Sequence, residues 1–273
     1  MKSQRIDWIS TGMLVVGSVV ILFPIYLTVV NALKTPQEIA QSVLSLPGSL
    51  TLENFRKAME LTNFSRSFAN SLFITVFAVL FTLLTNSLVA FAIGRNLHRK
   101  LYQGLYYYFV SALFIPFPVI MLPLVKETAM LKLDNQYGLV LLYIVYGLAF
   151  NIFVYVGYIK SIATTMDEAA YIDGASTWQV FWHVIFPLMT PINATVAILT
   201  TLWVWNDFML PLVILNARED MTLPVVQFVF QSQFSTDFNL AFASYLMAMA
   251  PLILVYLFAQ KWIIGNIMRG AIK

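Results

Sequence analysis

The sequence predicts an all-α integral membrane protein with six transmembrane helices. Hydrophobic residues make up 60% of its 273 residues and charged residues only 11%, against roughly 45–50% and about 25% in soluble domains. The apolar residues also gather in long intervals that are almost free of charge, and each interval reaches the ~20 residues that a membrane-spanning helix needs. One water-soluble core cannot bury this much apolar side chain, so lipid must cover part of it.

Polar connections separate the six predicted spans. The first span follows a basic start and could also be a cleaved signal peptide, with Val30-Asn31-Ala32 as the cleavage site. Its apolar run is longer than the roughly 7–15 residues of a signal sequence, which favours a retained span. The spans are predicted at about 8–33, 68–93, 105–125, 137–159, 191–215 and 245–264.

Proline and turn residues predict where these helices bend or end. The third span contains Pro116, Pro118 and Pro123. Because each proline removes a backbone donor, this helix should be bent or broken, with neighbouring helices covering the break. Residues 34–66 form a polar connection outside the bilayer, with a possible short helix at residues 52–61.

The distribution of charge predicts the orientation in the membrane. Six spans place both termini on one side, together with the connections after spans 2 and 4. Nine Lys and Arg residues fall on that side and seven on the other, and Arg95, Arg99 and Lys100 form the sharpest cluster. The positive-inside rule therefore places both termini in the cytoplasm. Because no repeat or linker divides the chain, residues 1–273 are expected to form a single domain.

Composition excludes several classes of function. The net charge of +3 is small and its basic residues are scattered, so a nucleic-acid partner is not indicated. The absence of cysteine from the sequence excludes disulfides and thiol nucleophiles. His98 and His183 lack partners at metal-ligand spacing, so no metal site is expected. No phosphate-binding G-x-x-x-x-G-K-[ST] loop occurs, so an ATP-hydrolysing site is not predicted in this chain.

The connection at residues 160–190 is the longest polar, structured interruption on the predicted cytoplasmic side. Thr165-Met-Asp-Glu168 and Ser176-Thr-Trp-Gln179 both fit the capping-box pattern that starts a helix. Gly174 lies between them and can adopt the left-handed conformation that ends a helix. Two short helices that meet at a glycine hinge are therefore predicted.

These two helices predict different surfaces. Trp178, Phe181, Trp182 and Ile185 recur at helical spacing, which is typical of a helix at the headgroup boundary. The first helix offers small and apolar residues for close contact, with acids that could steer a partner. Those residues are Ala169, Ala170, Tyr171 and Ile172, with the acids Asp167, Glu168 and Asp173. From pattern alone, an amphipathic connector without a partner explains the stretch equally well.

The stretch from Thr164 to Pro187 resembles the EAA loop of ATP-binding-cassette importer permeases. That pattern is E-A-A, three residues, Gly, nine residues and I-x-L-P; Glu168-Ala-Ala170, Gly174 and Pro187 match it. Val184 and Phe186 replace the usual Ile and Leu but remain apolar. Further stretches resemble the carbohydrate-uptake branch of the maltose-permease G-subunit type. They are L-P-G-S-L-T-L-E-N-F at 46–55, A-A-Y-I-D-G-A-S at 169–176, W-N-D-F-M-L-P at 205–211, M-T-L-P-V at 221–225 and R-G-A-I-K at 269–273.

The resemblance implies a transport subunit that lacks its own energy source. A second homologous permease, two ATPase subunits and an extracellular solute-binding protein are the implied partners, and ATP and Mg²⁺ would be used by the ATPases. The binding protein would deliver solute to the outer loops at residues 34–66 and 216–244. The resemblance also assigns ATPase coupling to Glu168, Ala169, Ala170, Tyr171, Ile172, Asp173, Gly174 and Pro187.

Three polar residues within the predicted spans are candidates for the translocation path: Asn151, Asn206 and Asp207. Asp207 is the only acid within a span, where desolvation demands compensation. It could line the path or only bond a neighbouring helix end. Trp203, Trp205 and Phe208 could stack on sugar rings or belong to an interfacial aromatic belt. Asn151 and Asn86 could bond a hydroxylated solute or join two helices.

Sequence leaves the transported solute open. A sugar or oligosaccharide is expected from the resemblance, with a polyol or a glycerophosphodiester as the alternative. A secondary transporter or channel would need ionisable residues at mid-membrane, and only Asp207, near one end of its span, is available. A membrane enzyme would need an acid–base or nucleophile cluster, and none is evident in the sequence.

Overall fold

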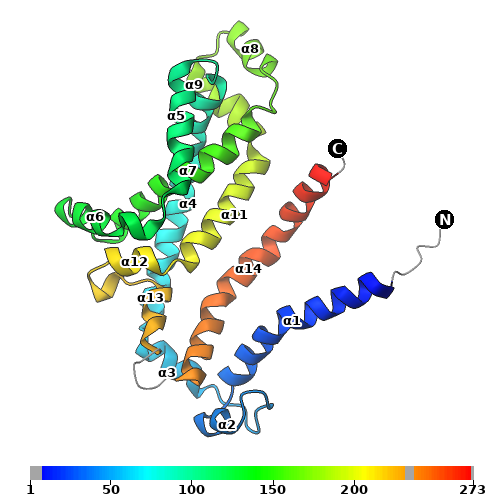
Figure 1. Cartoon of the computed structure of the whole chain (residues 1–273), viewed down its shortest axis with the longest axis vertical. Coiled ribbons are helices and arrows are strands. Elements are labelled where there is room, and N and C mark those ends of the chain that lie inside the picture. The colour runs from blue at the N-terminus through cyan, green and yellow to red at the C-terminus, as the bar shows by residue number, and fades with distance from the viewer. Residues whose placement is uncertain (1–7, 231–236, 272–273) are drawn as a thin grey trace. The chain divides into compact units, whose positions relative to one another are not determined.

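The computed structural model describes residues 8–230 and 237–271, with side chains described as far as residue 257 apart from Val229. Every regular element in these residues is a helix (Figure 1). The α-helices are α1 Trp8–Ala32, α2 Pro36–Gln41, α3 Glu53–Leu61, α4 Phe64–Arg95, α5 Lys100–Ser111, α6 Phe117–Met130, α7 Gln136–Ile159, α8 Thr165–Ile172, α9 Thr177–Gln179, α10 Phe186–Leu188, α11 Thr190–Asn206, α12 Met209–Ile214, α13 Leu223–Gln227 and α14 Phe238–Ala271. Three short 3₁₀ turns are η1 Ala112–Phe114, η3 Arg218–Asp220 and η4 Phe228–Phe230, and η2 Val180–Ile185 is a π-helix.

The helices are long and apolar enough for a multi-pass membrane protein. Four of them qualify alone as spans: α1, α4, α7 and the Phe238–Leu257 part of α14. Two bent helix pairs raise the number to six among the described residues if each pair is one span. The helical fold class predicted from the sequence is therefore confirmed, and the expected helix at residues 52–61 is present as α3.

The third predicted span is broken, as its prolines predicted. Helices α5 and η1 end before Pro116, and α6 begins at Phe117 after a turn of 105°. Pro116 has an extended backbone (φ −65°, ψ 135°), which stops the preceding helix. α5 and α7 lie side by side (Figure 1). Residues 111–116 are nevertheless exposed, Phe114 to 81%, so the expectation that neighbouring helices cover the break is wrong within this chain, because α7 contacts η1 without enclosing it.

The fifth predicted span differs from the expectation of one continuous helix at 191–215. Helix α11 ends at Asn206, Asp207 has an extended backbone (ψ 128°), and α12 begins at Met209. The physical reason is that the extended backbone of Asp207 ends α11, and its carboxylate accepts the backbone N–H of Met209, the first residue of α12, at 3.1 Å.

The described chain packs into two compact units, which we describe separately. The first contains the residues up to Ser65 and Val226–Ile253. Its apolar cluster joins the end of α1 to α3 and the start of α14 through Ala32, Ala58 and Ala243, all buried. The expected single domain remains a prediction. The terminal R-G-A-I-K motif reaches beyond the described residues.

Buried polar side chains organise the connection between α1 and α3. Asn54 donates to the carbonyls of Ala32 at 2.8 Å and Lys34 at 2.7 Å, and its own carbonyl accepts from Asn239 of α14 at 2.8 Å. The Lys34 ammonium is buried and donates to the Ser42 carbonyl at 2.9 Å. These bonds satisfy backbone carbonyl groups at and after the helix ends that have no partner within a helix, so the polar loop has a defined structure.

Glu38 fastens the far side of the same loop. Its carboxylate accepts the backbone N–H of Thr35 at 2.9 Å, closing a capping box at the start of α2. The other oxygen accepts the N–H groups of Gly48 at 2.8 Å and Ser49 at 3.2 Å. A Cβ at position 48 would lie 3.0 Å from that oxygen, so glycine permits the close approach.

The second unit contains residues 66–225 and the continuation of α14 from Leu254. One buried cluster lies where α4 and α7 meet the η2 segment, with Phe91, Tyr155, Ile159, Phe181 and Ile185 at its centre. A second cluster joins α4 and α7 to α11 and α12. This packing supports the loop after α7 at one end and the α11–α12 break toward the other.

The two ends of this unit are held by different polar contacts. At one end, Arg66 of α4 pairs with Glu219 at 2.7 Å and Gln136 of α7 donates to Asp220 at 3.2 Å. The Arg95 end of α4 instead meets the loop after α7, described below. The connections after the predicted spans 2 and 4 therefore lie at the same end of the unit, as six spans require.

Substituting Glu38 by Ala should loosen the outer loop. Hydrogen bonds lower the pKa of Glu38, first from the Thr35 backbone and then from Gly48 and Ser49. A lowered folded pKa means that the stabilisation is complete above the unfolded value and is lost as the pH falls below 4.5. In hydrogen-exchange mass spectrometry at neutral pH, peptides containing Gly48 and Ser49 should exchange faster in E38A.

The exposed Glu53→Ala variant is the control, because Glu53 pairs only with Arg56 and Lys57 on its own helix. Exchange at residues 48 and 49 should remain at the wild-type rate in E53A. Equal exchange in E38A and wild type would show that Glu38 does not hold the loop.

Candidate coupling loop and solute cavity

The first helix of the loop after α7 begins where the sequence predicts, but without the predicted capping box. α8 starts at Thr165, with Thr164 as the residue before it and no side-chain cap. The predicted capping box of Thr165 and Glu168 is therefore wrong. The reason is that Thr164 already has a helical backbone (φ −64°, ψ −23°), so Thr165 lies inside the first turn and cannot cap it.

The predicted glycine hinge is confirmed. Gly174 has φ +85°, and the N–H of Ala175 donates to the Ala170 carbonyl at 3.0 Å while that of Gly174 donates to Tyr171 at 3.0 Å. This pair of bonds is the Schellman arrangement, which requires a left-handed residue after the helix. Nothing lies within 4 Å of where a Cβ would be, so backbone conformation alone favours glycine here.

The second predicted capping box is also confirmed, because Ser176 and Gln179 satisfy each other's backbone N–H groups. The helix that follows becomes a π-helix at Val180–Ile185. Phe181 and Ile185 are buried among the side chains of α4 and α7 and do not face lipid. The prediction of a boundary helix is therefore wrong for these two residues, although Trp178 remains exposed.

The outward surface of α8 is apolar and acidic. Ile172 is 86% exposed and Tyr171 and Met166 are also exposed. Glu168, Ala169 and Asp173 share this exposed surface, whereas Ala170 is half-buried against the chain's own core. An exposed isoleucine beside acids on a short helix is typical of a surface that another protein covers.

Asp167 differs from the other acids of α8 because it is buried against Arg95. The Arg95 Nη2 donates to Asp167 Oδ1 at 3.0 Å, and Nε approaches Oδ2 at 2.6 Å as an ion-pair contact without hydrogen-bond geometry. The same guanidinium donates to the carbonyls of Ile159 and Ile162. The sequence suggested that Asp167 could steer a partner. Its charge is already paired with Arg95, so this expectation is wrong.

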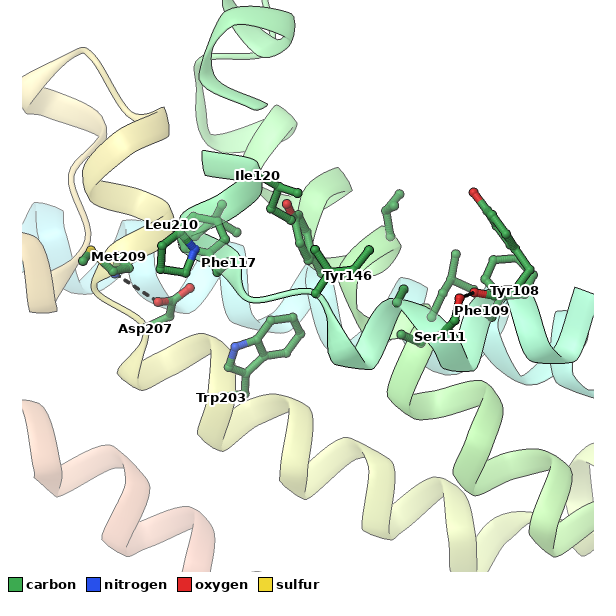
Figure 2. A pocket seen from close by; sticks show the side chains of 16 residues that line it. Tyr108, Phe109, Ser111, Phe117, Ile120, Tyr146, Trp203, Asp207, Met209 and Leu210 are labelled. Atoms are coloured by element: carbon green, nitrogen blue, oxygen red, sulfur yellow. Dashed lines mark hydrogen bonds between the residues drawn. The ribbon is translucent and has the colours of Figure 1, made fainter. Parts of the chain in front are cut away.

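A cavity of about 640 Å³ lies beside the break between α11 and α12. Its wall comes from α5, η1, α6, α7 and α11, and Trp203 and Asp207 project toward it from one side (Figure 2). The lining is mainly apolar and aromatic, with Phe117, Tyr146 and Tyr108 around it. A cavity of this size, with few polar groups among aromatic rings, has the dimensions and chemistry of a small-molecule site.

Asp207 is held in place by two neighbours. Its Oδ2 accepts the hydroxyl of the buried Tyr143 of α7 at 2.9 Å, and its Oδ1 caps α12 through Met209. Tyr143 also packs edge-on against Trp203, with ring centroids 5.2 Å apart. The structural contact expected with a neighbouring helix end is therefore present, and the carboxylate also borders the cavity.

The other candidate path residues lie in different places. Asn151 is buried and lines a cavity of about 260 Å³ with Tyr146 and Trp203, which also line the larger one. Asn206 is exposed and donates to the Leu202 carbonyl at 2.7 Å within its own helix. Asn86 donates to the Ile144 carbonyl at 3.4 Å, which joins α4 to α7 as expected for helix packing.

The described residues contain no group of three or more His, Cys, Asp or Glu side chains that could hold a metal ion. His183 Nδ1 lies 3.1 Å from the Gln179 carbonyl and is engaged within its own helix.

Two site residues were missed from the sequence. The sequence marks Arg95 only as a topology signal and Tyr143 only as part of an apolar span. The signal for Arg95 is its place at the very end of span 2, together with an acid in a loop on the same side of the membrane. Tyr143 had no comparable signal, because its position opposite Asp207 depends on how α7 packs on α11.

The fold defines a multi-pass helical membrane protein with a short exposed helix, α8, in the loop after α7. The family model described as "binding-protein-dependent transport system inner membrane component" matches residues 86–268. The chain belongs to this family, and it is a transport subunit and not an enzyme.

Relatives match across nearly the whole chain. The probable starch degradation products transport system permease protein AmyC of Thermoanaerobacterium thermosulfurigenes is 38% identical over 95% of this chain and 94% of its own length. The multiple sugar-binding transport system permease protein MsmG of Streptococcus mutans is 39% identical over 100% of this chain and 99% of its own. Membership of the carbohydrate-uptake permeases, suggested by the sequence motifs, is confirmed.

The fold is also known from a solved structure. A chain in the crystal structure of a bacterial ABC transporter involved in the import of the acidic polysaccharide alginate superimposes with a TM-score of 0.81. The match covers 96% of this chain and 98% of that chain at 24% identity. This likeness supports the helical arrangement and nothing about the solute.

Proposed function

We propose that this chain is the permease subunit of an ATP-driven importer that moves a sugar or oligosaccharide across the cytoplasmic membrane. The observation that carries the proposal is its similarity, over its full length, to permeases named for starch degradation products and for multiple sugars. The cavity beside Trp203 and Asp207 supports it, because aromatic faces and a few hydrogen-bonding groups are what a sugar ring requires.

The loop at residues 160–190 is proposed to couple this movement to ATP hydrolysis in a separate subunit. The exposed face of α8 would enter a groove of a cytoplasmic ATPase, with Ile172 and Tyr171 as apolar anchors. Glu168 and Asp173 would add charge, and Ala169 and Ala170 would permit close approach. Of these two alanines, Ala169 is exposed to a partner and Ala170 lets α8 approach the chain's own core. Gly174 and Pro187 would set the directions in which the chain leaves the loop. The exposure of Ile172 supports this role.

The proposed assembly contains a second homologous permease, two ATPase subunits and an extracellular solute-binding protein. ATP and Mg²⁺ would act at the ATPases. The binding protein would dock on the outer loops at 34–66 and 216–244. The buried hydrogen bonds of Asn54 and those accepted by the Glu38 carboxylate support an ordered structure for the first of these loops. Asn151, Asn206 and Asp207 are proposed to line or border the path of the solute.

Valine at position 174 should uncouple ATP hydrolysis from uptake without preventing insertion. A β-branched residue at φ +85° is strained by about 1–2 kcal/mol, which would tilt or unfold the end of α8. Uptake by complexes reconstituted in vesicles, divided by ATP hydrolysed, should fall in G174V. Asparagine tolerates the left-handed region, so G174N should retain more coupling.

Gly157→Val is the matched control, because Gly157 lies within α7 with open space around it and the same side chain is added. Its ratio of uptake to ATP hydrolysis should equal that of wild type. If G174V also matches wild type, the loop does not couple the two activities.

Trp203→Ala should impair sugar transport while sparing assembly. Loss of a stacking face is worth about 0.5–1.5 kcal/mol, or up to roughly tenfold in rate. A strain lacking this gene, tested on maltotriose, raffinose and chitobiose, should lose growth on at least one. W203A should restore that growth poorly and W203F better, whereas Trp8→Ala, which alters an exposed residue of α1, should restore it fully. Full restoration by W203A would remove Trp203 from the path.

Single cysteines should reveal the proposed orientation directly, because the natural sequence has none. We place Asp173 in the cytoplasm with both termini, and Ser49 outside. A membrane-impermeant maleimide added to intact spheroplasts should label S49C, and it should label D173C only after the membrane is opened. The reverse pattern would invert the topology.

A further inference from the structure

Arg95 contacts three elements through one guanidinium. Its own helix, α4, ends at this residue. Nη1 donates to the carbonyls of Ile159 at 3.2 Å and Ile162 at 3.0 Å, where α7 ends, and Nη2 donates to Asp167 of α8 at 3.0 Å. The guanidinium therefore connects α4 and α7 to α8, whose opposite face is exposed.

The connection is stiff for two reasons. The guanidinium is planar with donors in a fixed fork, so simultaneous contacts fix its orientation. The side chains are also shielded, with 13% of Arg95 and 10% of Asp167 exposed. A buried ion pair is costly to break, because separation leaves an uncompensated charge away from water. A displacement of α8 would therefore move the ends of α4 and α7 before it separated the pair.

The Arg95–Asp167 pair bridges α4 and α8 at the edge of a cavity. A cavity of about 530 Å³ lies between α8, the start of α9 and α4, and it is lined by Arg95, Asp167, Glu168 and Tyr171. α8 itself packs on η2, the π-helix at Val180–Ile185. Ala170 packs against the core, but an alanine side chain offers little area for transmitting force.

We propose that Arg95 is a positioning residue that carries the movement of α8 to α4 and α7. The inference rests on the proposed coupling role of the loop and names the residues through which the motion would enter the membrane part of the chain. α4 and α7 both extend from this end to the opposite end of the unit, where Arg66 and Gln136 bind the segment after α12. A shift at Arg95 can thus reach both ends of these helices.

A purely structural role for the pair predicts a different result. Loss of a structural contact would lower the amount of assembled complex and reduce hydrolysis and uptake together. Loss of a transmitting contact would leave the ATPases active while less sugar moves for each ATP hydrolysed. The ratio of uptake to hydrolysis therefore separates the two roles.

Asp167→Asn is the principal test variant, because it keeps the shape of the side chain and leaves Arg95 its bonds to the α7 carbonyls. The complex with its permease and ATPase partners is reconstituted in vesicles with the binding protein and radiolabelled maltotriose, or the panel sugar that supports growth. Uptake per ATP should fall about tenfold or more, the factor expected for losing a charge-assisted hydrogen bond. The ATPase rate should stay close to wild type.

Arg95→Lys and Arg99→Met complete the set. Lysine keeps the charge but loses the fork, so R95K should also lower uptake per ATP. The double variant R95K/D167N should be no worse than the more impaired single variant, because both act on one contact. Arg99 is an exposed cation of the same turn, and R99M should match wild type.

A wild-type ratio in D167N would overturn the proposal. Parallel loss of hydrolysis and uptake, or failure of D167N to assemble, would assign the pair to folding and overturn it as well. If R95K fails to assemble, D167N still decides the question. Gly174→Val separates the proposed coupling role of the loop from the transmitting role of Arg95. If G174V uncouples and D167N does not, only the role of Arg95 fails. Coupled uptake in G174V would mean that the role of the loop itself fails.

Discussion

A backbone N–H or C=O group inside a bilayer must find its hydrogen-bond partner within the protein, and this constraint governs the structure. It makes the spans helical and makes every interruption depend on side chains. Pro116 ends one helix, and the residues at this break are exposed in this chain. Asp207 ends another, and its carboxylate satisfies Tyr143 and the first turn of α12. Both interruptions border the cavity of about 640 Å³, so the route proposed for solute lies where the helices are broken.

At the aqueous ends, the same need is met by single charged or amide side chains that each hold several backbone groups. Asn54 and Glu38 do this in the first unit, and Arg95 does it where α7 ends. Such contacts give polar loops a defined shape without a large apolar core.

The sequence predicted the helical class, the proline break, the glycine hinge and the second capping box, because each depends on neighbours within a few residues. It was wrong about the Thr165 capping box and about a continuous helix at 191–215. It also left Asp167 among the steering charges. These errors share a cause, because periodicity reports neither backbone conformation nor packing. The helical backbone of Thr164 prevents Thr165 from capping, the bond from Met209 accompanies the end of the α11 helix at Asp207, and Arg95 pairs with Asp167.

By itself, the sequence determined that this chain lies in a membrane, that it belongs with carbohydrate-uptake permeases, and that its polar loop carries two helices around Gly174. Hydropathy and short motifs are local properties, so they can be read without coordinates. Only the tertiary structure decided which acids of α8 are free, which aromatic rings share a cavity, and that Arg95 joins α4, α7 and α8. Those facts depend on residues far apart in the chain, and only helix packing brings them together.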